Sequence, residues 1–173
     1  MTSNNNREIW DKVKHTNPRW TKPFGKFGKP LTAIDPMYQV MVMTDTFGPV
    51  GKGWNYKVSY TYTPTLVFAE VSVAHNKTAQ VKLLEKNGIT EEYWDYYGPV
   101  SSVQALTKKN GGLDDEAPKK AMTDALTKAF SHLGVSADVF LGMFDNSKYV
   151  EDMKEKFSQK PRVADEKLVK FNK

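Results

Sequence analysis

The sequence contains no cysteine and only three histidines among its 173 residues. The lack of cysteine excludes disulfide bonds, thiolate metal sites and cysteine nucleophiles. The histidines, His15, His75 and His132, are isolated and show no metal-ligand spacing. Few ways remain to build a catalytic or metal centre, so we expect neither a metal ion nor enzymatic activity.

Long apolar runs and nucleotide-binding loops are also missing. No run approaches the ~18 apolar residues that a membrane span needs. The glycine clusters at 25–28 and 48–53 lack the spacing and the Lys-Ser/Thr pair of a phosphate-binding loop. We therefore expect a cytosolic or nuclear protein that uses no nucleotide or other cofactor and has no membrane partner.

Positive charge is concentrated in the first 30 residues. The formal net charge is +5, and residues 1–30 contain seven Lys/Arg and two Asp/Glu, so this stretch carries the whole excess. Clustered cations favour an anionic partner such as nucleic acid, because they displace counterions from phosphates. A solvated basic arm that binds nothing is the alternative.

Aromatic residues alternate with these cations, a pattern that suits single-stranded nucleic acid because bases stack on rings while cations hold phosphates. The alternative is that Trp20, Phe24 and Phe27 pin the arm to the core. The candidate binding residues of the arm are Arg19, Trp20, Lys22, Lys26 and Lys29.

Hydrophobic periodicity predicts an α+β fold. Asp35-Pro36 starts a helix whose face of Met37, Val40, Met41 and Thr44 is expected in the core, and residues 54–62 and 66–75 alternate as two strands of a hairpin. Further strands are expected at 80–86 and 92–99, then a polar loop at 101–112 and a long helix that ends before Gly134. We thus predict an antiparallel sheet of about three to five strands packed on a long helix, with short helices at both ends.

The predicted organisation is a basic aromatic arm at 1–30, one folded domain at 31–158 and a flexible basic tail at 159–173. Acidic residues cluster at 91–95 and at 114–116. In principle such clusters hold magnesium for nuclease chemistry. Carboxylates at a helix start also interact favourably with the helix dipole, and this structural role is the preferred interpretation of the second cluster.

The stretch KKAMTDALTKAFSHLG at 119–134 resembles the long helix of the Rad fifty-two superfamily of strand-annealing proteins. The order of the other parts is similar too: a helix ending Phe47-Gly48, a strand starting Gly53-Trp54, a hairpin with Ala69-Glu70-Val71, and a strand end at Tyr97-Gly98. The resemblance covers about residues 31–150, and the chain is similar in size to phage annealing recombinases.

The resemblance implies that the protein binds single-stranded DNA and anneals complementary strands without ATP, in homologous recombination or repair. It also implies a homo-oligomeric ring or helical filament, a location in the bacterial host cytoplasm and, as a possible partner, a phage exonuclease or single-strand binding protein. A passive binder of single-stranded DNA or RNA that does not promote annealing is the rival interpretation, and a metal-dependent nuclease is the third.

When the residues of the family are matched to this sequence by position, Lys128 corresponds to a basic groove residue of the long helix. Lys108 and Lys109 correspond to the basic loop before that helix. The chain departs from the family at Thr127, Ser131 and Tyr38, where the relative has basic residues. Thr127 and Ser131 are then expected to hydrogen-bond phosphate, and Tyr38 to stack on a base. Lys120, on the same predicted helix face, completes the set of candidate DNA-binding residues.

Overall fold

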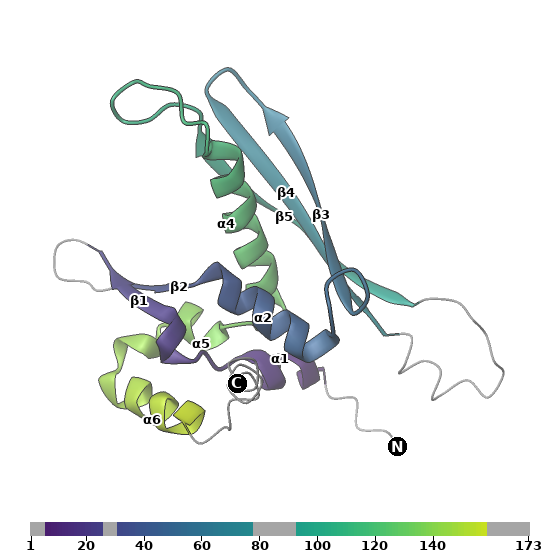
Figure 1. Cartoon of the computed structure of the whole chain (residues 1–173), viewed down its shortest axis with the longest axis vertical. Helices are drawn as coiled ribbons and strands as arrows, with labels where there is room; N and C mark the ends of the chain where they lie inside the picture. The colour runs from purple at the N-terminus through teal and green to yellow at the C-terminus, as the bar shows by residue number, and fades with distance from the viewer. Residues whose placement is uncertain (1–5, 26–30, 78–92, 159–173) are drawn as a thin grey trace, which may run out of the picture.

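The computed structural model describes residues 6–25, 31–77 and 93–158, which form two antiparallel sheets and several helices. The predicted α+β class is therefore confirmed (Figure 1). The elements in chain order are α1 (Glu8–Val13), the 3-10 helix η1 (Pro18–Trp20), β1 (Thr21–Phe24), β2 (Leu31–Ile34), α2 (Pro36–Phe47), β3 (Trp54–Tyr62), β4 (Leu66–Asn76), β5 (Trp94–Ala105), α4 (Ala117–His132), α5 (Ala137–Phe140), the 3-10 helix η2 (Met143–Asp145) and α6 (Ser147–Ser158).

The larger sheet has the strand order β3-β4-β5 and is antiparallel throughout. The predicted hairpin is confirmed, and it pairs β3 with β4 from Trp54↔His75 to Tyr62↔Val67. The predicted strand at 80–86 lies outside the described residues. The loop predicted from residue 101 is wrong at its start, because β5 runs through to Ala105. Pro99 lies where the β4–β5 register shifts, so its missing N–H does not end the strand.

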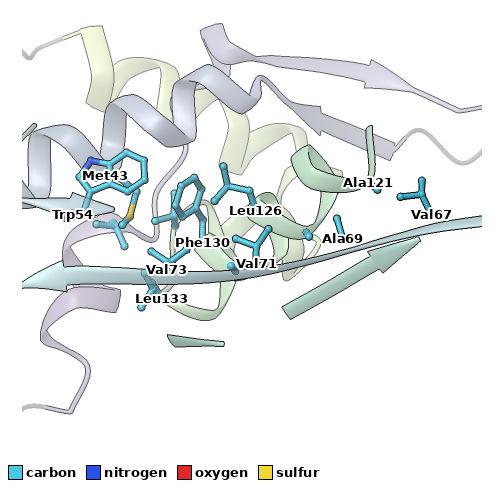
Figure 2. Packing of buried hydrophobic residues seen from close by; sticks show 14 of the residues in the cluster. Met43, Trp54, Val67, Ala69, Val71, Val73, Ala121, Leu126, Phe130 and Leu133 are labelled. Carbon is cyan, nitrogen blue, oxygen red and sulfur yellow. The ribbon is translucent and has the colours of Figure 1, made fainter. Parts of the chain in front are cut away.

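Helix α4 packs on the larger sheet along β4 and β5 (Figure 1). Its sheet-facing side carries four small residues that are almost fully buried and let the helix approach the strands closely: Ala117, Ala121, Ala125 and Ala129. Phe130 packs edge-on against Trp54 with 5.5 Å between the ring centroids, and β4 contributes a row of buried valines (Figure 2). The predicted long helix and its helical periodicity are confirmed.

Helix α2 begins as predicted, because the Asp35 side chain accepts a hydrogen bond from the Met37 N–H at 2.9 Å. The predicted core face is wrong at Met37 and Met41, which are 67% and 40% exposed, whereas Val40 packs against the core as predicted. The buried residues of the helix are instead Tyr38, Gln39 and Met43. The reason is that α2 contacts both α1 and β3, and those non-local contacts select a different stripe of the helix.

The N-terminal segment is tied to the C-terminal helices through a buried carboxylate. Asp138 of α5 is 2% exposed and accepts hydrogen bonds from the Thr16 N–H at 2.7 Å and the Thr16 hydroxyl at 2.6 Å. The Tyr149 hydroxyl of α6 also donates to Asp138 at 2.9 Å. The segment around Thr16 is therefore held to α5 and α6, which lie far from it in sequence, through one shared acceptor.

Strands β1 and β2 form a separate two-stranded antiparallel sheet in which Thr21 pairs with Ile34. The domain boundary expected at residue 30 thus falls between two paired strands. The short helices expected at both ends of the domain are present: α1 lies before the sheets, and α5 and α6 follow α4. Within the described residues, no helix is long and apolar enough to cross a membrane.

Candidate nucleic-acid interface

A shallow depression of about 430 Å³ lies on the side of α4 that faces away from the sheet. It separates α4 from the junction of β2 with α2, and Ile34 and Pro36 form its far wall. Ile34 pairs with Thr21 of β1, the strand that also carries Lys22, but no β1 residue lines the depression. Its α4 side consists of Glu116, Lys119, Lys120, Thr123, Asp124 and Thr127.

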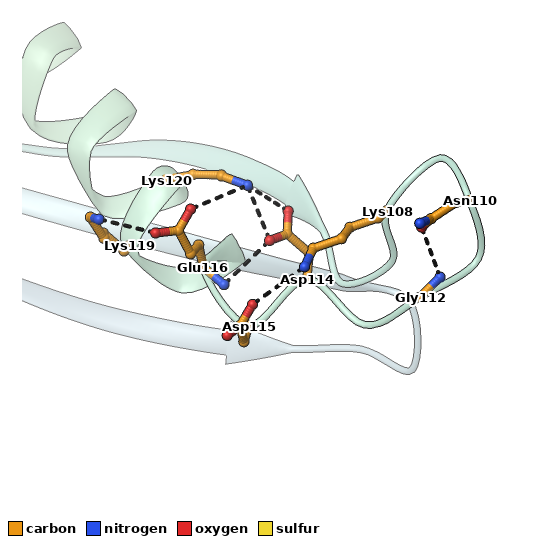
Figure 3. Close-up of polar contacts among 8 residues, drawn as sticks. All are labelled: Lys108, Asn110, Gly112, Asp114, Asp115, Glu116, Lys119 and Lys120. Carbon is orange, nitrogen blue, oxygen red and sulfur yellow. Dashed lines mark hydrogen bonds and ion pairs between the residues drawn. The ribbon is translucent and has the colours of Figure 1, made fainter.

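The lysines at the start of α4 are held by carboxylates of the same region (Figure 3). Lys120 Nζ lies 2.8 Å from an Asp114 oxygen and 3.9 Å from a Glu116 oxygen. Lys119 pairs with Glu116 at 3.3 Å. The Lys120 ammonium lowers the pKa of Asp114 through its hydrogen bond, and Asp114 raises the pKa of Lys120 in turn. This end of the depression is thus close to neutral.

Lys128 has a similar arrangement two turns further along α4. Its Nζ lies 3.4 Å from Asp124 Oδ2, and the Asp124 carboxylate also accepts a short hydrogen bond from the buried Ser102 hydroxyl of β5. Asp124 is therefore fixed on the sheet side while it neutralises Lys128. The Ser131 hydroxyl donates to the Lys128 carbonyl at 2.7 Å, so it must leave this bond before it can donate to a phosphate.

The two lysines of the loop after β5 differ from each other. Lys108 lies 3.6 Å from an Asp115 oxygen, and its backbone N–H donates to the Gly112 carbonyl at 2.6 Å to close the loop. Lys109 is exposed and forms no ion pair with any residue that the structure describes. Lys109 is therefore the cation of this loop that is available to an external anion.

Tyr38 does not occupy the position predicted for it, because it is only 5% exposed. Its hydroxyl accepts a hydrogen bond from the Asn17 N–H at 3.0 Å and donates to the His15 carbonyl at 3.4 Å. Burial raises the pKa of Tyr38. Its ring stacks on Trp20 at 6.2 Å, so Tyr38 supports Trp20 and is not accessible to a base in this structure.

Trp20 is half-buried between Tyr38 and Arg19, whose guanidinium lies 5.6 Å from the Trp20 ring centroid. The face of the Trp20 ring that stacks on the buried Tyr38 therefore agrees with the alternative, in which Trp20 anchors the segment to the core. Arg19 and Lys22 are exposed, and within the described ranges neither makes an ion pair. The remaining predicted arm residues, Lys26 and Lys29, lie outside the described residues.

The predicted residues thus form two groups. The first group belongs to α4 and the loop before it: Lys120 and Thr127 line the depression, Lys128 follows Thr127 on the helix, and Lys108 lies near the start of α4. The second group belongs to η1 and β1 and consists of Arg19, Trp20 and Lys22. Of the lining residues that were not predicted, Lys119 and Thr123 are the two that can donate a hydrogen bond to a phosphate from their side chains. Lys119, Thr123 and Thr127 follow one another at intervals of four residues, which is the sequence signal that places all three on one helix face.

No three acidic or histidine side chains within 6–25, 31–77 and 93–158 are arranged to hold a metal ion. In the acidic cluster at 114–116, each carboxylate instead pairs with a lysine. No protein-family model matches the chain, and no curated protein sequence is similar to it.

Proposed function

We propose that this protein binds single-stranded DNA and anneals complementary strands without a nucleotide cofactor, as a homo-oligomer of the strand-annealing type. The observation that carries the proposal is the depression between α4 and the β2–α2 junction. It lies along the helix that resembles the annealing family, and its wall residue Ile34 pairs with Thr21 of the strand that carries Lys22. This site offers cations and polar side chains to a backbone of phosphates.

The exposed candidate cations that pair with no described carboxylate are expected to make the first phosphate contacts. They are Arg19, Lys22 and Lys109, of which Arg19 also contacts the Trp20 ring. Phosphate contacts require reach and charge but no base-specific geometry, so such a site holds a strand of any sequence. Bases that are not held by the protein then remain available for pairing, which explains how annealing proceeds without nucleotide hydrolysis.

The paired lysines Lys108, Lys120 and Lys128 contribute less, because a phosphate must first displace a carboxylate from each. An exposed ion pair is worth about 0–1 kcal/mol, so this exchange is possible at a small cost. The site is therefore expected to bind moderately and with a strong dependence on salt.

The test is fluorescence anisotropy with a labelled oligonucleotide of mixed sequence, offered as a single strand and as a duplex, over a range of salt concentrations. We expect the protein to bind the single strand, and we expect the logarithm of its affinity to fall linearly with the logarithm of the salt concentration. Absence of single-strand binding at low salt would refute it. The alternative, a passive single-strand binder, passes this test but slows annealing when complementary strands are mixed.

The finer parts of the proposal are the annealing-type fold, a ring or filament, a cytoplasmic location in a bacterial host and cooperation with a phage exonuclease or single-strand binding protein. They rest on the helix motif and the order of elements. Negative-stain images of the protein with and without oligonucleotide test the assembly directly. Particles that stay monomeric under both conditions would remove the ring or filament from the account.

A further inference from the structure

Strand β3 carries a row of aromatic rings on one face of the sheet. Trp54, Tyr56, Tyr60 and Tyr62 alternate along the strand, with Val58 completing the row. Their partners on β4 are buried, which shows that the row lies on the face against which α4 packs. These partners are His75, Val73, Ala69 and Val67.

Most of this row is left uncovered, because α4 packs along β4 and β5 and β3 lies on the far side of β4 (Figure 1). Trp54 is 1% exposed beneath the end of α4, whereas Tyr56 and Tyr60 are each 38% exposed and Tyr62 is 57% exposed. The three tyrosines thus form a surface at an open sheet edge, referred to below as the tyrosine row.

The spacing of these rings suits a flat aromatic ligand. Tyr60 and Tyr62 have ring centroids 6.3 Å apart with planes 33° from parallel, and Trp54 and Tyr56 are similar at 6.2 Å and 25°. A base inserted between two rings requires about 6.8 Å, twice the ~3.4 Å rise of stacked bases. Alternate side chains of a strand are separated by about this distance. A small rotation of two exposed side chains opens the gap.

The electrostatics of the strand indicate an anionic partner. Residues 46–69 include Lys52 and Lys57 but no acidic residue. Both lysines are exposed, and neither pairs with a carboxylate of a described residue. Burial, together with the neighbouring Tyr62 and Tyr56, raises the pKa of Tyr60, so Tyr60 stays uncharged at neutral pH.

We propose that the tyrosine row is a stacking platform for the bases of single-stranded nucleic acid. This inference rests on the proposed function and adds a second contact surface to it. The second surface binds the bases of the strand and not its phosphates. Stacking covers the faces of a base and leaves its pairing edge exposed, so a strand held in this way remains able to anneal. Lys57 lies on the opposite face of β3 from the row, so the phosphates of a stacked polynucleotide reach Lys57 only where the backbone follows the edge of β3.

The test compares an ordinary single-stranded oligonucleotide with an abasic one of the same length. The variant Tyr60→Leu/Tyr62→Leu keeps an apolar surface but removes stacking, and Tyr60→Phe/Tyr62→Phe keeps the rings. Tyr96→Leu is the matched control, since Tyr96 is 67% exposed on β5. We expect the leucine variant to bind the ordinary strand at least about tenfold more weakly than wild type. Its affinity for the abasic strand should change less than twofold, and the other two variants should match wild type.

Sedimentation of each variant completes the design, because a second copy of the chain is the other candidate for this surface. Equal affinity of wild type and the leucine variant for the ordinary strand overturns the inference, as does an equal loss on both strands. Dissociation of an oligomer by the leucine substitutions, without a base-dependent loss, also overturns it and assigns the surface to a second copy. The wild-type protein reports separately on the proposed function, which fails only if it does not bind the ordinary strand.

Discussion

Asp124 forms an ion pair with Lys128, which lies one turn further along α4, and 3.4 Å separates Asp124 Oδ2 from Lys128 Nζ. The lysine that best matches the family's basic groove is therefore already neutralised within the chain. A phosphate that approaches Lys128 also meets the Asp124 carboxylate, which lines the depression. The proposed binding of DNA at this position is then a competition between an internal and an external anion.

Removing the internal anion should strengthen binding. Asp124→Asn keeps an oxygen acceptor for Ser102 but deletes the negative charge beside Lys128. We expect affinity for single-stranded DNA to rise about three- to tenfold, as for one exposed charge interaction of about 1 kcal/mol. Glu151→Gln on α6 is the control, because it breaks a comparable pair with Lys154 at 3.0 Å away from the depression. Unchanged or weaker binding of Asp124→Asn would contradict this role.

The exposed cations of the N-terminal segment should control the salt dependence. Arg19→Ala/Lys22→Ala removes two charges that form no ion pair with a described residue. Each phosphate contact to a single strand contributes about 0.7 to the slope of log affinity against log salt, so the slope should fall by about 1.4. Lys148→Ala, an exposed lysine on α6, should leave the slope unchanged. A full wild-type slope in the double variant would place the phosphate contacts elsewhere.

Local patterns allowed part of this structure to be predicted, and non-local contacts explain most of the rest. The period of α4 and the alternation of β3 and β4 are properties of short windows, and both were confirmed. The burial of Tyr38 depends on Asn17 and Trp20, which no periodicity connects to α2. The predicted Met37 face failed for the same reason.

The candidate site was predictable only as a set of charges. The sequence indicates Lys120 and Lys128 on one side of a helix, but it does not show which carboxylates neutralise them. Similarly, alternation places Tyr60 on one face of a strand, whereas its exposure depends on where α4 crosses the sheet. Such information comes from the packing of elements and not from any one segment.

The buried Asp138 should be a major source of stability. It accepts hydrogen bonds from Thr16 and Tyr149, so Asp138→Ala leaves several buried donors without an acceptor. We expect the free energy of unfolding to fall by about 2–4 kcal/mol, measured by urea denaturation. Asp145→Ala, at an exposed position in η2, should stay within about 0.5 kcal/mol of wild type. Similar values for the two variants would show that the buried network is dispensable.

Stability should also depend on pH through His75. Burial lowers the pKa of His75; Lys77 adds to this effect, and Asp95 at 4.0 Å opposes it. The Nε2 atom also shares a 2.8 Å hydrogen bond with the Tyr97 hydroxyl, and Phe47 stacks on the ring. Because the unfolded chain binds this proton more readily, stability is complete above about pH 6.5 and falls as the pH drops below it.

The loss is expected to reach at most about 1.4 kcal/mol per pH unit for this one proton. Urea unfolding at pH 7.5, 6.5 and 5.5 should therefore show a steeper decline for wild type than for His75→Gln. His132→Gln removes an exposed histidine and should decline like wild type. Parallel curves for wild type and His75→Gln would show that His75 titrates equally in the folded and unfolded chains.

The most direct test of the central claim is the rate at which two complementary labelled strands anneal in the presence of this protein, with EDTA and without any nucleotide. We expect the annealing rate to exceed the spontaneous rate over a range of protein-to-DNA ratios. The variant Arg19→Ala/Lys22→Ala/Lys109→Ala should accelerate annealing less than wild type does. An unchanged or slower rate at every ratio would contradict annealing and favour a passive single-strand binder.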